Sequence, residues 1–249
     1  MAKKDREKEE PVATAEPAKP QPKKPANTAA EWTKSILIAL ALFLFLRTFL
    51  VQTFVITSGS MEETLLVGDM LVVNRAAIGS RVPGTSLRIP GYSEPRLGDV
   101  IVFDPPHEET LKLIKRLVGM PGDTLEMRNR ALWRNGKPVD EPYVVHEPAA
   151  DEAHPWMEWQ EDYLVPGTDP RTYVGTRDNW GPIVLPEDRY FMLGDNRENS
   201  LDSRYWGLLE GWRLEGRAVF TYFSYNKGSY RPFPWIREIR WGRLFRPID

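Results

Sequence analysis

The chain has 249 residues, 27% of them charged, and a formal net charge of -2. This length allows one large domain or two small ones, and the nearly balanced charge gives no indication of nucleic-acid binding. The absence of cysteine excludes disulfides, thiolate metal sites and a cysteine nucleophile, and 3 histidines leave little material for a histidine-based metal site or catalytic triad.

The N-terminal region changes from a polar tail to an apolar segment. Residues 1–31 are mainly Lys, Glu, Pro and Ala, and because they offer almost nothing large to bury, we predict a disordered tail. Residues 36–46 are uninterrupted apolar sequence, and the stretch 32–51 has the ~20 residues that a helix needs to cross a bilayer. Arg47 lies close enough to one end of this stretch to reach the headgroups. We therefore predict a single transmembrane anchor over 32–51.

Lysines flank this anchor on one side. The N-terminal side carries Lys19, Lys23, Lys24 and Lys34, whereas residues 51–74 contain no Lys or Arg. Because basic flanks stay in the cytoplasm, the N-terminus is predicted to be cytoplasmic and the chain after the anchor to lie outside. A cleaved signal peptide is one alternative, which the long leader and the absence of an Ala-x-Ala site disfavour. A buried core helix is the other, which the one-sided charge disfavours.

The rest of the chain is predicted to be rich in β-structure. The 22 prolines argue against a mostly helical fold, because proline breaks helices. Asn135-Gly136 is typical of a two-residue hairpin turn. Short runs of β-branched and aromatic residues, separated by turn residues, predict strands at 70–74, 100–103, 111–118, 189–193 and 218–223.

Three segments have an unusual composition. Residues 77–97 are rich in Gly, Pro and Arg, which predicts an extended loop or ribbon. Residues 138–170 are acidic without any Lys or Arg, and we interpret them as an exposed, irregular stretch. Residues 226–249 mix basic and aromatic side chains, which can rest on an anionic bilayer surface. The interpretation preferred from the sequence is that their aromatics pack on the β-domain.

Lys115 is a candidate general base. In a strand over 111–118 the side chains alternate between the two faces, so Lys115 shares a face with Leu111, Leu113 and Leu117. Burial among leucines lowers the pKa of a lysine. A neutral lysine can then accept a proton from a serine hydroxyl. The alternative is a lysine at a strand edge whose ammonium reaches water.

The nucleophile expected for such a base lies just after the anchor. In Ser58-Gly59-Ser60-Met61 the glycine allows a sharp turn that exposes both hydroxyls. Ser60 is the candidate nucleophile, with the Ser58 hydroxyl or the Ser60 backbone N–H as oxyanion donor. Taken alone this tetrapeptide is weak evidence, because Ser-Gly-Ser also occurs in ordinary linkers.

A dense polar loop over 194–207 is the third candidate element. So many charged and amide groups need partners if they are buried. Asp195 or Asp202 could pair with Arg197 or Arg204 and brace a site. A calcium site is an alternative, but the spacing of the acidic residues does not match the regular calcium loop.

Four segments together resemble a known family. They are Ser58–Met61 after an anchor, Gly98–Phe103, Ile114–Asp123 and Gly194–Gly207, and in this order they look like the characteristic segments of bacterial type I signal peptidase. The resemblance implies a mainly antiparallel β fold. It places a catalytic core at 52–123 and 188–225, and a smaller inserted β-rich domain at 124–187.

The resemblance also implies roles for individual residues. Ser60 is the nucleophile, Lys115 the general base and Ser58 an oxyanion donor. Ser200 orients the lysine, and Asp202 and Arg204 form a supporting ion pair to which Asp195 adds. Candidate residues for shallow apolar substrate pockets are Met61, Leu65 and Ile114.

The activity implied is removal of signal peptides from exported preproteins at the outer face of the cytoplasmic membrane, without metal or cofactor. The expected substrates have small residues at positions -1 and -3 and bind as an added strand. Glu62-Glu63 stands where family members often have proline, and Glu198 stands where aspartate is common. Two alternatives stay open: a Ser/Lys peptidase with one regulatory substrate, and a non-catalytic extracytoplasmic binding module.

Overall fold

A computed structural model describes residues 28–81, 85, 87–108 and 111–248. The chain divides into two compact units, Met1–Leu42 and Phe43–Asp249. Most of the predicted tail lies outside the described residues, but its last four positions do not: helix α1 spans Thr28–Phe49. Alanines at its start extend the helix, because alanine is the best helix former. The helix ends two residues before the expected end of the anchor, because strand β1 begins at Val51.

Helix α1 is long and apolar enough to cross a membrane, judged by its length and composition. Its side chains from Ala29 to Arg47 are exposed, and those from Ile36 to Leu46 are apolar around the whole helix rather than on one stripe. A helix of this kind is typical of a membrane span or of the centre of a large core.

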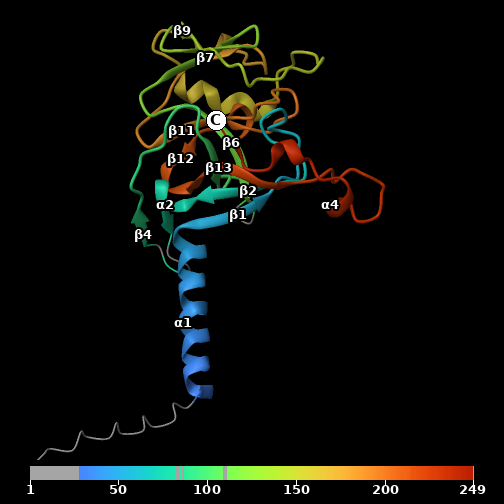
Figure 1. Ribbon diagram of the computed structural model, residues 1–249. Coiled ribbons are helices and arrows are strands. Elements are labelled where there is room, and N and C mark those ends of the chain that lie inside the picture. Colours follow the sequence, from blue (N-terminus) through green and yellow to red (C-terminus); the bar gives the residue numbers. More distant parts are fainter. Residues whose placement is uncertain (1–27, 82–84, 86, 109–110, 249) are drawn as a thin grey trace, which may run out of the picture. The chain divides into compact units, whose positions relative to one another are not determined.

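The expected mainly antiparallel β fold is confirmed (Figure 1). The large sheet has the order β1-β2-β13-β5-β6-β11-β12, with β14 paired to β13, and its neighbouring strands are antiparallel. The strands are β1 (Val51–Val55), β2 (Asp69–Asn74), β5 (Val100–Phe103), β6 (Leu113–Gly119), β11 (Arg189–Leu193), β12 (Leu209–Glu210), β13 (Leu214–Ser224) and β14 (Arg246–Pro247).

A second, four-stranded sheet has the order β10-β7-β8-β9 and lies at the opposite end of the β-rich unit from β1 (Figure 1). Its strands are β7 (Thr124–Arg128), β8 (Ala131–Arg134), β9 (Lys137–Pro138) and β10 (Trp180–Val184). The expected Asn135-Gly136 turn joins β8 to β9, and both residues have positive φ (51° and 75°). That is the conformation of a type I′ hairpin turn.

Short elements complete the fold. Strands β3 (Gly79–Arg81) and β4 (Arg88–Pro90) form a two-stranded ribbon inside the segment 77–97. The short helices are α2 (Arg75–Ile78), α3 (Ser203–Trp206), α4 (Pro234–Arg237), η1 (Pro155–Tyr163), η2 (Pro170–Thr172), η3 (Gly211–Arg213) and η4 (Trp241–Arg243), where η marks a 3-10 helix.

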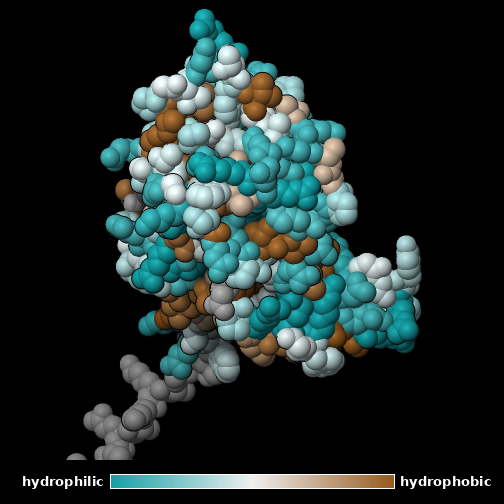
Figure 2. Space-filling model, turned by 90° about the horizontal axis from the view of Figure 1, so that it is seen from above, coloured by the Kyte–Doolittle hydropathy of each residue, from teal (hydrophilic) through white to brown (hydrophobic). Residues whose placement is uncertain are grey.

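The large sheet is buried on both faces near its centre. Val100 and Val102 of β5 pack in one apolar cluster, whereas Ile101 and Phe103 pack in another. Because successive strand residues point to opposite faces, the two clusters lie on opposite sides of β5. Because β6 pairs with this doubly buried strand, a lysine side chain on β6 is shielded from solvent. The outer surface seen in Figure 2 is mostly hydrophilic, with apolar residues in separate patches.

The C-terminal segment agrees only in part with the preferred prediction. The ring of Phe245 lies 6.3 Å from the ring of Phe220 in β13, but Trp241 and Phe245 are each 72% exposed, and Trp235 is 51% exposed. The pairing of β14 with β13, the side chain of Ile248 and several arginines also hold the segment to the sheet. Arg243 forms an ion pair with buried Asp69 at 2.6 Å and donates to the Thr64 carbonyl at 2.8 Å. The basic side chains therefore contribute to holding this segment, while its tryptophans stay largely exposed.

Candidate active site

Ser60 lies in a tight turn that follows β1. The Glu62 N–H donates to the Gly59 carbonyl at 3.0 Å, and the Leu65 N–H donates to the Met61 carbonyl at 2.6 Å. Met61 and Leu65 are buried in the apolar cluster below the turn. These two side chains anchor the turn in the core, so the neighbouring Ser60 hydroxyl is held in one place.

Lys115 meets this serine from strand β6. Its Nζ is hydrogen-bonded to Ser60 Oγ, although the two residues are 55 positions apart in sequence. The lysine side chain is 3% exposed. Burial lowers the pKa of Lys115 to about 8, against the raising effect of Asp202 and Asp195 and with the help of Arg204. A large fraction of this lysine is therefore neutral at mildly alkaline pH.

Ser58 lies beside the pair, with its Oγ 3.4 Å from Ser60 Oγ. Its hydroxyl is thus close to the position where an oxyanion would form. The Ser60 backbone N–H is the second candidate donor. Two donors around a reacting carbonyl are the usual composition of an oxyanion hole.

The loop 194–204 packs against the Ser60 turn. The Asn196 N–H donates to the Ser60 carbonyl at 3.1 Å. A Cβ atom on Gly194 would lie 2.2 Å from Ser200 Oγ and 2.6 Å from the Ser60 carbonyl oxygen, so only glycine fits there. This close approach brings the charges of the loop next to Lys115.

Asp202 and Arg204 form the buried ion pair that was expected. Arg204 Nε and Nη2 donate to the two carboxylate oxygens of Asp202 at 2.8 and 2.9 Å. Although burial alone would raise it, the pKa of Asp202 is lowered, chiefly by Arg204. The Gly194 N–H also donates to Asp202, at 3.1 Å. The pair therefore stays charged beside Lys115.

Ser200 is buried next to this pair, but it makes no standard hydrogen bond to Lys115 among the residues that the structure describes. Its hydroxyl lies near enough to Asp202 to help lower the pKa of that carboxyl. Ser200 is thus close to the lysine's surroundings, and its expected role in orienting the lysine stays a prediction.

Asp195 pairs with Arg116 and not with an arginine of its own loop. Arg116 Nε and Nη2 donate to its carboxylate at 2.9 and 2.8 Å, and Thr64 Oγ1 donates at 2.6 Å. Arg197 instead pairs with Glu141 at 2.6 Å. Since the loop carboxylates face guanidinium groups, the alternative of a calcium site has no support in this loop. Sequence reasoning missed Arg116, Thr64 and Glu141, because nothing local links residues so far apart.

A cavity of about 230 Å³ opens beside Ser60 and Lys115. Ile114 lines it, as expected, but Met61 and Leu65 do not, because both are buried in the core below the turn. The full lining is Phe54, Val55, Ile56, Thr57, Ser58, Ser60, Val102, Leu111, Lys112, Leu113, Ile114 and Lys115.

Strand β6 has an open edge along this cavity. It pairs with β5 from Leu113 to Arg116, but β11 pairs with it only from Arg116 onward. Among the described strands none pairs with Leu113–Lys115 on the β11 side. Free backbone groups on such an edge can accept an extended peptide as a further strand. A buried serine–lysine pair, an oxyanion site and an open edge together suit attack on a peptide carbonyl.

Comparison with known proteins finds one matching family and several similar proteins. The family described as "Signal peptidase, peptidase S26" matches residues 29–223. The chain is 38% identical over 209 residues to signal peptidase I of Pseudomonas aeruginosa, covering 78% of this chain and 72% of that protein. It is 33% identical to signal peptidase I of Bacillus licheniformis, over 81% of this chain and 92% of that one. A signal peptidase I structure from Enterococcus faecalis is 29% identical over 50% of this chain and 97% of its own, with a TM-score of 0.34.

Proposed function

The chain belongs to the signal peptidase family, peptidase S26, and we propose that it removes signal peptides from exported preproteins with Ser60 as nucleophile and Lys115 as general base. Membership of this family supports the activity of a serine peptidase that removes signal peptides from preproteins. The observation that carries the assignment of residues is the hydrogen bond between buried Lys115 and Ser60. A serine hydroxyl becomes nucleophilic only with a base in reach, and Lys115 is within reach.

The proposed reaction has two steps. Neutral Lys115 takes the proton of Ser60, and Ser60 Oγ attacks the carbonyl of the residue at position -1. The Ser58 hydroxyl and the Ser60 N–H stabilise the oxyanion, and the protonated lysine gives its proton to the leaving amine. Lys115 then takes a proton from a water that attacks the acyl-enzyme, and Ser60 recovers its hydroxyl as the signal peptide leaves.

The substrate is proposed to add as a strand along Leu113–Lys115. The open edge of β6 supplies backbone partners, and the adjoining cavity of about 230 Å³ supplies room for side chains at alternate positions. Ile114 and Val102 are among the apolar residues that line this cavity. The cavity has room for alanine-sized side chains, as the expected preference for small residues at -1 and -3 requires.

Cleavage of a preprotein by the purified, detergent-solubilised protein tests the function. We expect a mature-size product cut after a small residue, as the similarity to signal peptidases implies. The measurement is the mass of the two products. The matched substrate carries leucine at position -1 and is expected to stay uncut. Cleavage of both substrates at the same rate would contradict the proposed specificity, and cleavage of neither would favour a peptidase with one dedicated substrate or a binding module.

We further propose that α1 anchors the protein in the cytoplasmic membrane with the β-rich unit outside. The length and apolar composition of α1 support an anchor, and the lysines before it support a cytoplasmic N-terminus. The exposed aromatics of the C-terminal segment, Trp235, Trp241 and Phe245, stand among arginines, a combination that suits a membrane–water interface.

Protease added outside intact spheroplasts tests this orientation. We expect it to degrade the β-rich unit and to leave an epitope tag placed before residue 28 intact, because the membrane shields the cytoplasmic side. Lysed spheroplasts are the control, in which the tag is also lost. Loss of the tag with the β-rich unit intact would mean that the orientation is reversed.

A further inference from the structure

The acidic stretch 138–170 contains a segment that runs beside the loop 194–204. We define this segment, residues 141–147, as the strap. The Val145 N–H donates to the Asp195 carbonyl at 2.9 Å, and the Arg197 N–H donates to the Val145 carbonyl at 3.2 Å, so Val145 and Asn196 form a parallel β-bridge. Asn196 is also the residue whose N–H binds the Ser60 carbonyl. One residue therefore separates the strap from the peptide group of the nucleophile.

Glu141 at the start of the strap neutralises a buried guanidinium of the loop. It pairs with Arg197 at 2.6 Å, where the two side chains are 8% and 2% exposed. Arg197 also donates to the Gly194 carbonyl at 3.1 Å and accepts from Arg204 through its own carbonyl at 2.5 Å. Removing Glu141 would leave Arg197 as a buried charge without its carboxylate, which is costly in a dry environment. The ion pair thus fixes both ends of the loop.

Tyr143 holds the strand that carries the base. Its ring lies under the Arg116 guanidinium, whose central carbon is 3.7 Å from the ring centre. Burial, with Glu141 nearby, raises the pKa of Tyr143, so its hydroxyl stays protonated and donates to Glu141 at 3.0 Å. Arg116 is the residue after Lys115 and pairs with Asp195. Through Arg116, the Tyr143 side chain therefore connects the strap both to Asp195 of the loop and to the backbone next to Lys115.

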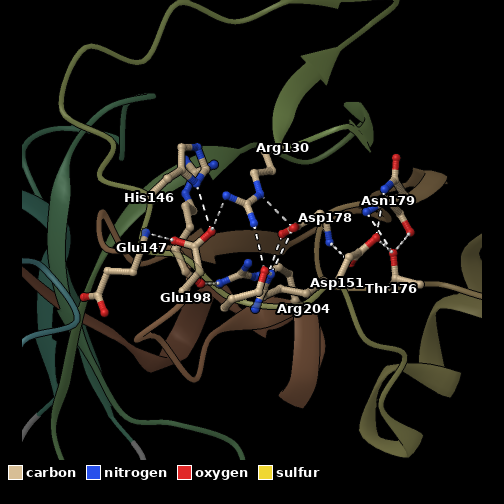
Figure 3. Close-up of polar contacts among 12 residues, drawn as sticks. Arg130, His146, Glu147, Asp151, Thr176, Asp178, Asn179, Glu198 and Arg204 are labelled. Carbon is tan, nitrogen blue, oxygen red and sulfur yellow. Dashed lines mark hydrogen bonds and ion pairs between the residues drawn. The ribbon is translucent and has the colours of Figure 1, made fainter.

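At the end of the strap, His146 and Glu147 contact the loop residue Glu198 (Figure 3). The Glu147 N–H donates to the Glu198 carboxylate at 2.9 Å, and His146 Nδ1 lies 3.0 Å from it. Arg130 approaches the same carboxylate at 3.7 Å. The Glu147 carboxylate in turn accepts from Asn196 Nδ2 at 2.6 Å. The strap is thus bound to four successive loop residues, Asp195 to Glu198, by backbone and side chain together.

We propose that Glu141 and Tyr143 are positioning residues for catalysis, because through them the strap holds the loop 194–204 and Arg116 in register with Ser60 and Lys115. This inference rests on the proposed function. The acidic stretch then has a task beyond solubility, although it does not touch the reacting atoms. Misplacement of reacting groups by about 1 Å can cost about 100-fold in rate, so a loosened strap affects the chemical step.

The test compares Glu141→Gln, Tyr143→Leu and Tyr143→Phe with Glu158→Gln in the full-length, detergent-solubilised protein. Glu158 is an exposed carboxylate of the same acidic stretch and is the matched control. Steady-state cleavage of a preprotein gives kcat and KM, and thermal unfolding shows that each variant is folded at the assay temperature.

We expect Glu141→Gln and Tyr143→Leu to lower kcat at least about tenfold with KM within about twofold. Tyr143→Phe, which keeps the ring under Arg116, is expected to retain more activity than Tyr143→Leu. A merely structural role would change the unfolding temperature and leave kcat of the folded protein unaltered, and that result would overturn the inference. So would a rise in KM at constant kcat, which would mean substrate contact. If the wild type itself fails to cleave, the proposed function fails instead. Should Tyr143→Leu not fold, Glu141→Gln decides alone.

Discussion

Lys115→Met is expected to lower kcat/KM for preprotein cleavage at least about 10³-fold, because a positioned general base contributes about 10²–10⁴-fold and the nucleophile depends on it. Methionine has nearly the length of lysine and no charge, so it suits a site that is only 3% exposed. Ser60→Ala is expected to have an equal or larger effect, because it removes the attacking oxygen. The measurement is kcat/KM with a fluorogenic preprotein peptide, alongside thermal unfolding of each variant.

The double variant Ser60→Ala/Lys115→Met sharpens this test. Because the two groups act as one unit, we expect it to be no slower than the worse single variant. The control is Lys137→Met, an exposed lysine of β9, which should cleave at the wild-type rate. Cleavage within tenfold of wild type by folded Lys115→Met would exclude this lysine as the base.

The strands were predictable because their signals are local, whereas the pairing of Ser60 with Lys115, 55 positions apart, was expected from the base that a nucleophilic serine needs and from the family resemblance. Alternating leucines around Lys115 predicted a desolvated lysine, and β6 buries it; the strand begins at Leu113 and not at Leu111, since Leu111 belongs to the connection from β5. Turn residues predicted the hairpin at Asn135-Gly136, and its positive φ angles explain why those residue types occur there.

Long-range pairings were not predictable, because no pattern in the sequence says which buried charges meet. Arg116 and Asp195 are 79 residues apart, and Arg197 and Glu141 are 56 apart. From the loop alone, Asp195 had nearby arginines as equally good partners. The acidic stretch looked like a solvated surface for the same reason: its composition shows charge, but only the fold shows that Glu141 is buried against a guanidinium.

The roles of the apolar residues near Ser60 were also ambiguous in the sequence. Met61 and Leu65 follow Ser60 closely, which suits either a substrate cavity or an anchor in the core, and the structure buries both. The opposite holds for Trp241 of the C-terminal segment, which was expected to be packed and is 72% exposed. Hydrophobicity predicts that a side chain favours a non-aqueous neighbour, but it does not identify the neighbour.

The charges around Lys115 should control the pH dependence of the reaction. Lys115 must be unprotonated to act, so kcat/KM is expected to rise with pH through a midpoint near the lysine pKa of about 8. Asp202 raises this pKa and Arg204 lowers it. Asp202→Asn should therefore move the midpoint to lower pH, and Arg204→Gln should move it to higher pH. The measurement is kcat/KM from pH 5 to 10 at a temperature where each variant is folded, because breaking a buried ion pair costs about 3–5 kcal/mol of stability.

The chain offers a matched control for this pair of variants. Asp169 and Arg171 repeat the spacing and the two-bond geometry of Asp202 and Arg204, with distances of 3.1 and 3.0 Å, but on the surface, where the arginine side chain is 88% exposed. Water screens that pair, so Asp169→Asn and Arg171→Gln should leave the midpoint where the wild type has it. Opposite shifts for the buried pair and none for the exposed pair mean that the titrating base lies beside Asp202 and Arg204, as Lys115 does. Shifts of the same sign in both buried variants would mean that another group, away from this ion pair, sets the pH dependence.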